Sequence, residues 1–370
     1  AKRVFEVFKP WGLPPEILAV VAVIMLGLPT AYSGASGIIL LAVGAVIYEE
    51  LRRVGARRQL ALATTAMTGG AGVVLSPCIL IVMIAMLNKE VVTDELFYWG
   101  KLVFSLTIFV FVVFALITNR GKFHVESPKT ALKPTLNALS RLFPYVGISL
   151  GVGVIYAFAL NAYLDQFSAP IILPVILIAF LAYEKNIDVR HNDERAMPKV
   201  GSALTDSVSQ ASTHIGAILI FGCCSLPLAG VVERSSSMMD IPDAFSSVWV
   251  AMSFFVVAMI LIGMFIDAIG AVALISGSFA AIAYNSGIHP IHFWMVALVA
   301  VELGYLSPPV AMNHLLTRQV VGESEVEKAA LEGDSFWYRH EKILLPIAVM
   351  GTTLVIVAFG PLIVGYETKF

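Results

Sequence analysis

Residues 72–78 read Gly-Val-Val-Leu-Ser-Pro-Cys, and residues 304–310 read Gly-Tyr-Leu-Ser-Pro-Pro-Val. Each stretch interrupts a long apolar run. Each also follows, further upstream, a second apolar segment broken by glycines, at residues 26–37 and 262–271. A duplicated pair of membrane segments interrupted by glycine and proline is the best sequence pointer to the binding site of a secondary transporter. The repeat therefore predicts both a fold and the place of its site.

The composition sets the class of protein. The chain is 58% hydrophobic and 14% charged, with a mean hydropathy of +0.85, whereas soluble domains are about half apolar and about a quarter charged. Many apolar runs exceed the roughly 20 residues that cross a bilayer as a helix. Alternating strand patterns are absent, which disfavours a barrel. We expect an all-α polytopic membrane protein, and its net charge of −2 leaves no basic surface for nucleic acid.

The apolar runs divide the chain into three expected parts. A first repeat covers residues 1–118, a linker with scaffold spans covers 119–200, and a second repeat covers 201–370. The expected elements of the two repeats are a hairpin at 14–48, a broken helix at 60–88, a hairpin at 246–284, a broken helix at 292–317 and a last span at 343–364. Cys78, Cys223 and Cys224 lie in apolar runs without metal-ligand spacing, so we expect free thiols.

Basic residues indicate how the segments cross, because Lys and Arg are enriched in cytoplasmic loops. Suppose that segments 14–48 and 246–284 each enter and leave on the same side. The inner loops then hold all of the 24 Lys and Arg residues except Lys89, Lys101, Arg234 and Lys369. If either segment crossed once, this bias would collapse. We therefore predict two re-entrant helical hairpins in halves of opposite orientation, which is an inverted repeat. Arg57 counts here as a topological charge, so its replacement by Ala is expected to matter little.

The broken segments have a chemistry of their own. Irregular backbone at membrane depth is tolerated where it lines a cavity, and a broken helix frees carbonyls that suit a cation and N–H groups that suit an anion. Oxygen-rich sites with few carboxylates fit an alkali cation better than a divalent one. An anionic substrate would rely on helix ends, hydroxyls and bound cations, because the breaks hold no basic residue. The side-chain oxygens at the breaks belong to Ser33, Ser36, Ser76, Asp267 and Ser307.

Other polar residues in these runs allow two readings. A single Ser-Pro is often only a kink, but two matched copies favour binding. A carboxylate in the membrane is a functional hypothesis by default, although Asp267 at a hairpin tip could instead face water. Glu302 is either a titrating group or a structural partner. His314 could relay protons, though a hydrogen-bonded structural role is favoured. Glu302 and His314 are thus the candidates for a proton or charge relay.

The breaks and their surroundings resemble a known family. Gly-Met-Phe-Ile-Asp at 263–267, Gly-Ile-His-Pro-Ile-His-Phe at 287–293 and residues 302–313 resemble the large membrane (DctM-like permease) subunit of TRAP, or tripartite ATP-independent periplasmic, transporters. In the first half, residues 33–36 and 72–77 resemble its serine-rich hairpin tip and its first break. The chain departs from the family pattern at Ser307 for Thr, Cys78 for Pro and Ala311 for Gly. The family's first spans are not found, which is compatible with a fragment that lacks them.

The resemblance implies an elevator-type transporter of the ion transporter superfamily in a bacterial inner membrane. The hairpins and broken helices would form a mobile transport domain against a scaffold. A small membrane subunit and a periplasmic substrate-binding protein would be the partners, and organic acids such as C4-dicarboxylates or sialic acid would enter with sodium. Carried over by position, the cation sites would use Ser33, Ser36, Gly72, Ser76, Asp267, Gly270, Gly304 and Ser307, and the substrate would lie near Ser76, Ser307 and Asn313.

Several functions remain in competition. The leading one is sodium-coupled uptake of an organic acid with a binding protein, and the closest alternative is a stand-alone anion symporter driven by sodium or protons. An ion channel would use the breaks as a selectivity filter. A membrane enzyme or scaffold would show no sodium dependence. The chain contains no Gly-x4-Gly-Lys-Ser/Thr loop and no nucleophile–base pattern, so we expect neither ATP binding, a catalytic residue nor an organic cofactor.

Overall fold

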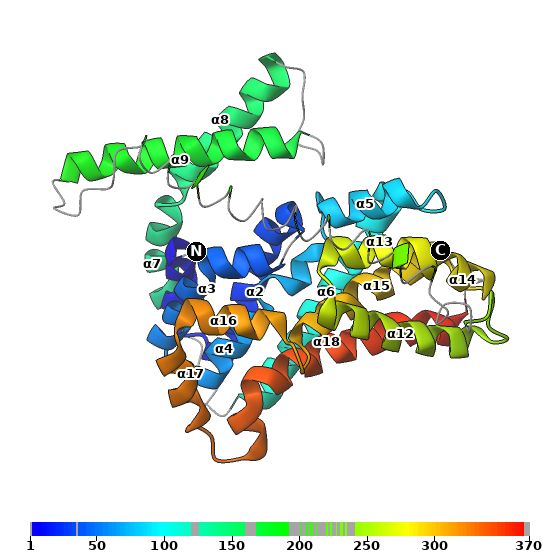
Figure 1. The fold of residues 1–370 in the computed structure, drawn as a ribbon. Helices are drawn as coiled ribbons and strands as arrows, with labels where there is room; N and C mark the ends of the chain where they lie inside the picture. The colour runs from blue at the N-terminus through cyan, green and yellow to red at the C-terminus, as the bar shows by residue number, and fades with distance from the viewer. Residues whose placement is uncertain are drawn as a thin grey trace.

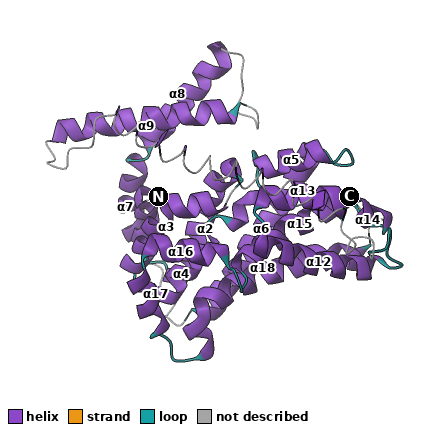
Figure 2. Cartoon of the chain, in the orientation of Figure 1, coloured by secondary structure: helices purple, strands orange, loops and turns teal. Residues whose placement is uncertain are grey.

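The computed structural model describes residues 2–34, 36–119, 126–159, 168–191 and 241–365, together with isolated positions between 201 and 234. All elements in these ranges are helices (Figures 1 and 2). Their bounds are α1 Lys2–Phe8, η1 Lys9–Trp11, α2 Pro15–Ser33, α3 Ser36–Arg53, α4 Arg58–Met67, η2 Gly70–Val74, α5 Ile79–Leu87, α6 Thr93–Thr118, α7 Pro128–Ser140, α8 Phe143–Ala159, α9 Ala169–His191, α12 Val248–Phe265, α13 Ala268–Ser278, α14 Ala280–Asn285, α15 Pro290–Leu306, α16 Met312–Val321, α17 Glu323–Ala330 and α18 Phe336–Val364.

Both expected hairpins are interrupted helices. In the first, α2 ends at Ser33 and α3 begins at Ser36, and Gly34 between them has the left-handed φ of 67° that glycine adopts without a Cβ penalty. In the second, α12 ends at Phe265, and the extended Ile266 and Asp267 lead into α13. The positions of both breaks are confirmed, whereas re-entry from one side of a membrane stays a prediction.

Both expected broken helices are also interrupted at their Ser-Pro sequences. The segment Arg58–Val74 bends by 43° into Ile79–Leu87. The second run stops at Leu306 and resumes at Met312, after Ala311 in a left-handed conformation with φ 47°. Each break contains a cis peptide bond, before Pro77 and before Pro309. Helices α6, α12 and α18 are long and apolar enough to cross a membrane, so the chain is a multi-pass membrane protein.

Helices α7 to α9 form an arm on the side of the molecule where α2 and α3 lie. In Figure 1, α8 and α9 stand clear of the main body, and α7 leads to them. Helix α8 exposes large apolar side chains such as Phe143, Leu150 and Phe158. Helices α7, α8 and α9 lie within residues 119–200, where the sequence predicts a linker with scaffold spans. The apolar run at 211–232, where a further span is expected, has only isolated described positions.

Two glycine pairs hold each hairpin against the broken helix of its own half. A Cβ atom on Gly72 would stand 2.8 Å from the Cα of Gly27 on α2. A Cβ atom on Gly304 would likewise stand 2.8 Å from the Cα of Gly263 on α12. Small residues let membrane helices approach this closely. The sequence repeat, which equates Gly27 with Gly263 and Gly72 with Gly304, is therefore repeated in the packing.

The second arm of each hairpin contacts the broken helix of the other half. Helix α3 lies against α16, where a Cβ on Gly44 would be 3.2 Å from Val320. Helix α13 lies against α5, where Asn88 Nδ2 donates to Ser276 Oγ at 3.0 Å. The two halves are thus interlocked by reciprocal contacts. This pattern is what a two-fold repeat requires; its orientation in a bilayer and an elevator movement stay predictions.

Ion pairs connect the first turn of α2, the N-cap residue of α4 and helix α18. Arg57 bonds Glu16 at 3.1 Å and Glu341 at 2.9 Å, and Glu341 is fully buried. The interpretation of Arg57 as a topological charge alone is wrong, because counting loop charges takes no account of their partners. Nearby, Glu325 accepts hydrogen bonds from Tyr48 Oη at 2.8 Å, Arg58 Nε at 3.0 Å and Lys328 Nζ at 2.9 Å.

Candidate functional site

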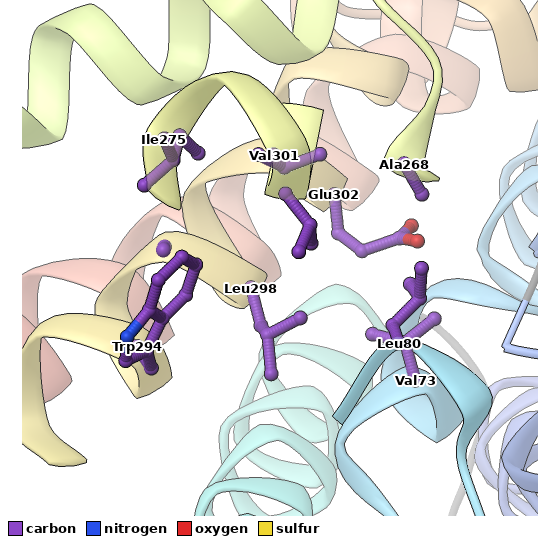
Figure 3. Close-up of a pocket in the computed structure, with 10 residues that line it drawn as sticks. Val73, Leu80, Ala268, Ile275, Trp294, Leu298, Val301 and Glu302 are labelled. Atoms are coloured by element: carbon purple, nitrogen blue, oxygen red, sulfur yellow. The ribbon is translucent and has the colours of Figure 1, made fainter. Parts of the chain in front are cut away.

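A small pocket draws its walls from both halves of the chain (Figure 3). Val73 of η2 and Leu80 of α5 come from the first broken helix, and the remaining walls come from α13 and α15. The volume of this pocket is about 10 Å³. This is close to the smallest cavity volume that can hold one water molecule. Among its lining residues, Glu302 is the only one with a side-chain oxygen; the others are Val73, Leu80, Ala268, Val272, Ile275, Trp294, Ala297, Leu298 and Val301.

Glu302 connects the second broken helix to the first hairpin. It lies one turn before the end of α15 with 3% of its surface exposed, and its carboxylate points between Ala268 and the Leu80–Val73 wall in Figure 3. Its side chain hydrogen-bonds that of Ser36, and Oε2 is buried without a hydrogen-bond partner. A Cβ on Gly70 would stand 2.9 Å from Oε2, so glycine makes room for the carboxylate.

The tip of the first hairpin rests on the first broken helix. Ser36 is buried at the start of α3, and its backbone lies so close to Gly69 that a Cβ there would overlap it. Gly34 lies against Cys78 and Ile79, beyond the break. Ser36 is therefore held in place by tight backbone packing. The side chain of Ser33 lies outside the described part of the structure.

The two predicted cation ligands of the first break, Gly72 and Ser76, differ in their exposure. Gly72 is buried in η2 against Gly27 and Thr30. Ser76 lies in the turn after η2 and is exposed. Cys78, immediately after the cis bond, is a buried free thiol, and the described Cys223 is also free, while Cys224 lies outside the described residues. The expectation of free thiols is confirmed for Cys78 and Cys223.

Asp267 is the N-cap of α13. Its carboxylate accepts from the backbone N–H of Ile269 at 3.2 Å and of Gly270 at 3.4 Å. Such a cap satisfies N–H groups that the helix leaves open, and it places negative charge at the positive end of the helix dipole. The carboxylate is partly buried, whereas Gly270 is buried. The predicted Asp267–Gly270 unit therefore exists as a capped helix end at the second hairpin tip.

The second break buries its serine. Ser307 ends α15, is 8% exposed, and donates through Oγ to the carbonyl of Leu303 at 2.7 Å. Gly304 is packed closely against the backbone of Gly263. Asn313 follows on α16, 1% exposed, with an amide Nδ2 that lacks a hydrogen-bond partner. An unpaired buried donor is costly unless something binds it, which makes Asn313 the strongest of the three predicted substrate ligands.

His314 does not line the pocket that contains Glu302. It lines a second cavity of about 160 Å³ between α4, α16, α17 and α18, beside Arg318 and Lys342. Its ring hydrogen-bonds the backbone of Leu306, and Nε2 is buried without a partner. Glu302 and His314 line separate cavities in the described part of the chain, and their shared role as a relay stays a prediction.

The structure thus brings Ser36, Glu302 and the first break together, and it sets Asp267 beside the same pocket through its neighbour Ala268. Ser76 and His314 do not line that pocket. The sequence analysis did not predict a role for Gly70. The adjacent glycines Gly69 and Gly70, just before the first break, were the signal that could have indicated it. Within the described ranges, no group of three His, Cys, Asp or Glu side chains lies together as a metal site requires.

The sequence is similar to those of known proteins over most of its length. The family model described as "Tripartite ATP-independent periplasmic transporter, DctM component" matches residues 11–363. The chain is 26% identical over 315 residues to the C4-dicarboxylate TRAP transporter large permease protein of Pseudomonas aeruginosa, covering 82% of this chain and 69% of that protein. It is 21% identical over 361 residues to the protein of that name from Vibrio cholerae, covering 94% and 79%. An isethionate TRAP transporter permease of Oleidesulfovibrio alaskensis is 28% identical over 108 residues, covering 29% and 15%.

Proposed function

The chain belongs to the DctM family of tripartite ATP-independent periplasmic transporters, and from this premise we propose that it imports an organic acid with sodium across a bacterial inner membrane. The observation that carries the proposal is that the first hairpin tip and the first broken helix meet the second half at one place. The first broken helix lies against α13 and α15 around the Glu302 pocket, and the hairpin tip contacts α15 through the hydrogen bond between Ser36 and Glu302. Secondary transporters bind their substrates at such repeat interfaces.

The substrate is proposed to be a small organic anion with a carboxylate. Two relatives are named for C4-dicarboxylates, which supports a carboxylate, whereas a third is named for isethionate, whose acid group is a sulfonate. The buried, unpaired Nδ2 of Asn313 and the N-terminus of α16 supply donors suited to an anion. Sodium would use the hydroxyls of Ser33, Ser36, Ser76 and Ser307, the carboxylate of Asp267 and backbone oxygens at Gly72, Gly270 and Gly304.

A tripartite transporter has two further components. We propose a periplasmic substrate-binding protein that delivers the acid and a small membrane subunit. The arm of α8 and α9, with its exposed apolar side chains, belongs to the part that the sequence assigned to the scaffold. The hairpins and broken helices would move against that scaffold as an elevator.

Reconstitution tests the proposal. Liposomes holding this chain with its small subunit should accumulate a labelled dicarboxylate when an inward sodium gradient and the binding protein are both present. Replacing sodium by potassium, or omitting the binding protein, should reduce accumulation to the level of empty liposomes. Accumulation by this chain alone would instead identify a stand-alone symporter. Single-channel currents would identify a channel, and uptake indifferent to sodium would contradict the coupling.

A further inference from the structure

Lys342 differs from the basic side chains around it. Arg57, Arg58 and Arg318 each form at least one ion pair with a glutamate. Lys342, in the second turn of α18, is half-buried, and its ammonium group forms no ion pair with a described residue. Only its backbone N–H is bonded to a side chain, the Oε1 of Gln59 at 3.1 Å. Because a partly buried charge without a counter-charge is unfavourable, Lys342 is a cation that lacks an anionic partner.

The cavity that Lys342 lines is large enough for such a partner. Its volume is about 160 Å³, and its described lining contains the basic side chains of His314, Arg318 and Lys342 and no acid. Lys342 lies within electrostatic range of the other two. A cavity of about 150 Å³ can hold a benzene-sized molecule, so an ion of the size of phosphate fits. Leu315 and Arg318 are exposed, and the cavity therefore reaches the surface of the protein.

His314 adds an acceptor to the two cations. Its ring hydrogen-bonds the backbone of Leu306, and Nε2 is buried without a partner among the described residues. The bond to Leu306 therefore belongs to Nδ1, which donates to the carbonyl. A neutral imidazole that donates through Nδ1 presents Nε2 as an acceptor. A ligand in this cavity should thus offer a hydroxyl hydrogen to Nε2 as well as negative oxygens to Lys342 and Arg318.

Hydrogen phosphate matches these groups better than the other small occupants. Water would satisfy Nε2 of His314, but it would leave the charge of Lys342 uncompensated. Sulfate has negative oxygens but no hydrogen at neutral pH. Hydrogen phosphate offers negative oxygens, which lysine and arginine bind strongly, and a P–O–H group that can donate to Nε2. Arg318 pairs with Glu323 through Nη2 and keeps further N–H donors, because a guanidinium has several.

We propose that the cavity between α4, α16, α17 and α18 binds hydrogen phosphate through Lys342, Arg318 and His314. The bound anion would connect α16, the helix that follows the second break, to α18. A phospholipid headgroup shares the negative oxygens, but its phosphodiester lacks the P–O–H group. The site uses none of the residues proposed above as sodium or substrate ligands. The inference therefore goes beyond the proposed function and does not depend on it.

Equilibrium dialysis of the purified full chain in a nonionic detergent against radiolabelled inorganic phosphate tests the inference without any transport. The wild type should bind one phosphate per chain at saturation. Lys342→Gln should weaken binding about tenfold or more, because hydrogen bonds from charged groups are the strong ones. The control Lys328→Gln removes the same charge from an exposed position on α17 and should leave binding unchanged. Either the absence of saturable binding or equal weakening in the two variants would overturn the proposal.

Unlabelled competitors test the role of His314 and the source of the phosphate group. Phosphate should displace the label better than sulfate in the wild type, and this difference should disappear in His314→Leu, which keeps both cations. The comparison can be made even if Lys342→Gln does not fold. Equal displacement by the two ions in the wild type would contradict the role of Nε2. Stronger displacement by dihexanoyl phosphatidylglycerol would assign the cavity to a lipid headgroup, and stronger displacement by succinate would assign it to a carboxylate; either result would overturn the proposal.

Discussion

Arg57 and Glu341 form a two-point ion pair. Nη2 donates to Oε1 at 2.9 Å and Nε donates to Oε2 at 3.1 Å. The same guanidinium bonds Glu16 at the start of α2. One side chain therefore fastens the first hairpin, the first broken helix and α18 together. A planar guanidinium serves two carboxylates in this way, which a lysine could not do equally well.

Replacing Arg57 with Ala should strongly destabilise the fold. Removing one partner of a buried pair costs about 3–5 kcal/mol, because the other charges remain buried. Here two acids, Glu16 and Glu341, would lose their cation. The thermal unfolding midpoint of the purified protein in detergent measures the effect. Arg141→Ala is the matched control, since that side chain is 70% exposed and its pair with Glu6 spans 3.7 Å. Equal midpoints for the two variants would contradict the role of Arg57.

Gly304→Ala should destabilise the junction of α12 and α15. The added methyl would meet backbone atoms of Gly263 and Ile260, which cannot turn aside as a flexible side chain can. Overpacking of this kind costs about 1–3 kcal/mol. Gly351→Ala in α18 is the control, because its Cβ would lie 4.0 Å from the nearest atom, a side-chain carbon of Leu303. Thermal midpoints should fall for Gly304→Ala only; a similar fall for both would show that the close approach is irrelevant.

Asp267→Asn should separate helix capping from cation binding. Asparagine caps helices about as well as aspartate, whereas alanine loses roughly 1 kcal/mol. An ion that binds only the folded state stabilises it by RT ln(1 + c/Kd) at ion concentration c, and so raises the unfolding midpoint. Sodium, compared with potassium, should therefore stabilise the wild type and not Asp267→Asn, while Asp267→Ala should be less stable in either salt. Full sodium stabilisation of Asp267→Asn would remove Asp267 from the cation site.

The cluster around Glu325 predicts a pH effect on stability. Hydrogen bonds from Lys328, Tyr48 and Arg58 lower the pKa of Glu325 from its ordinary 4.5 to about 2. Because the folded-state pKa is below the unfolded one, the stabilisation is present above pH 4.5 and is lost as the pH falls toward 2. Glu325→Gln should thus be less stable than the wild type at neutral pH, and the difference should shrink on acidification. A difference that is constant with pH would rule out this charge effect.

The positions of the four breaks could be predicted because glycine and proline act locally. Gly34 needs a left-handed φ, and the Ser-Pro sequences stop α15 and the first broken helix within a few residues of the expected points. The sequence repeat also matches Gly27 with Gly263, but the packing of α2 on η2 and of α12 on α15 is a finding of the structure. The break positions depend on residues close together in the chain, so a single sequence suffices to find them.

Contacts between distant segments could not be predicted in the same way. Ser36 and Glu302 were both candidates, but nothing in the sequence indicated that they bond each other across the halves. Arg57 was misinterpreted because a charge count does not reveal that Glu16 and Glu341 converge on it. Ser76 and Ser307 look equivalent in the repeat, yet one is exposed and the other buried. Which of these side chains contact each other is decided by the tertiary fold.

The reciprocal contacts of α3 with α16 and of α13 with α5 have a consequence for biogenesis. While the ribosome is still making the C-terminal half, the nascent chain exposes the surface of α3 that α16 contacts in the folded protein. The first hairpin must therefore enter the membrane before all of its packing partners have been synthesised. Its α3 surface lacks the contact with α16 until the C-terminal half is complete. A gene split between the codons for residues 119 and 126 should give functional protein only when both pieces are synthesised in the same cell.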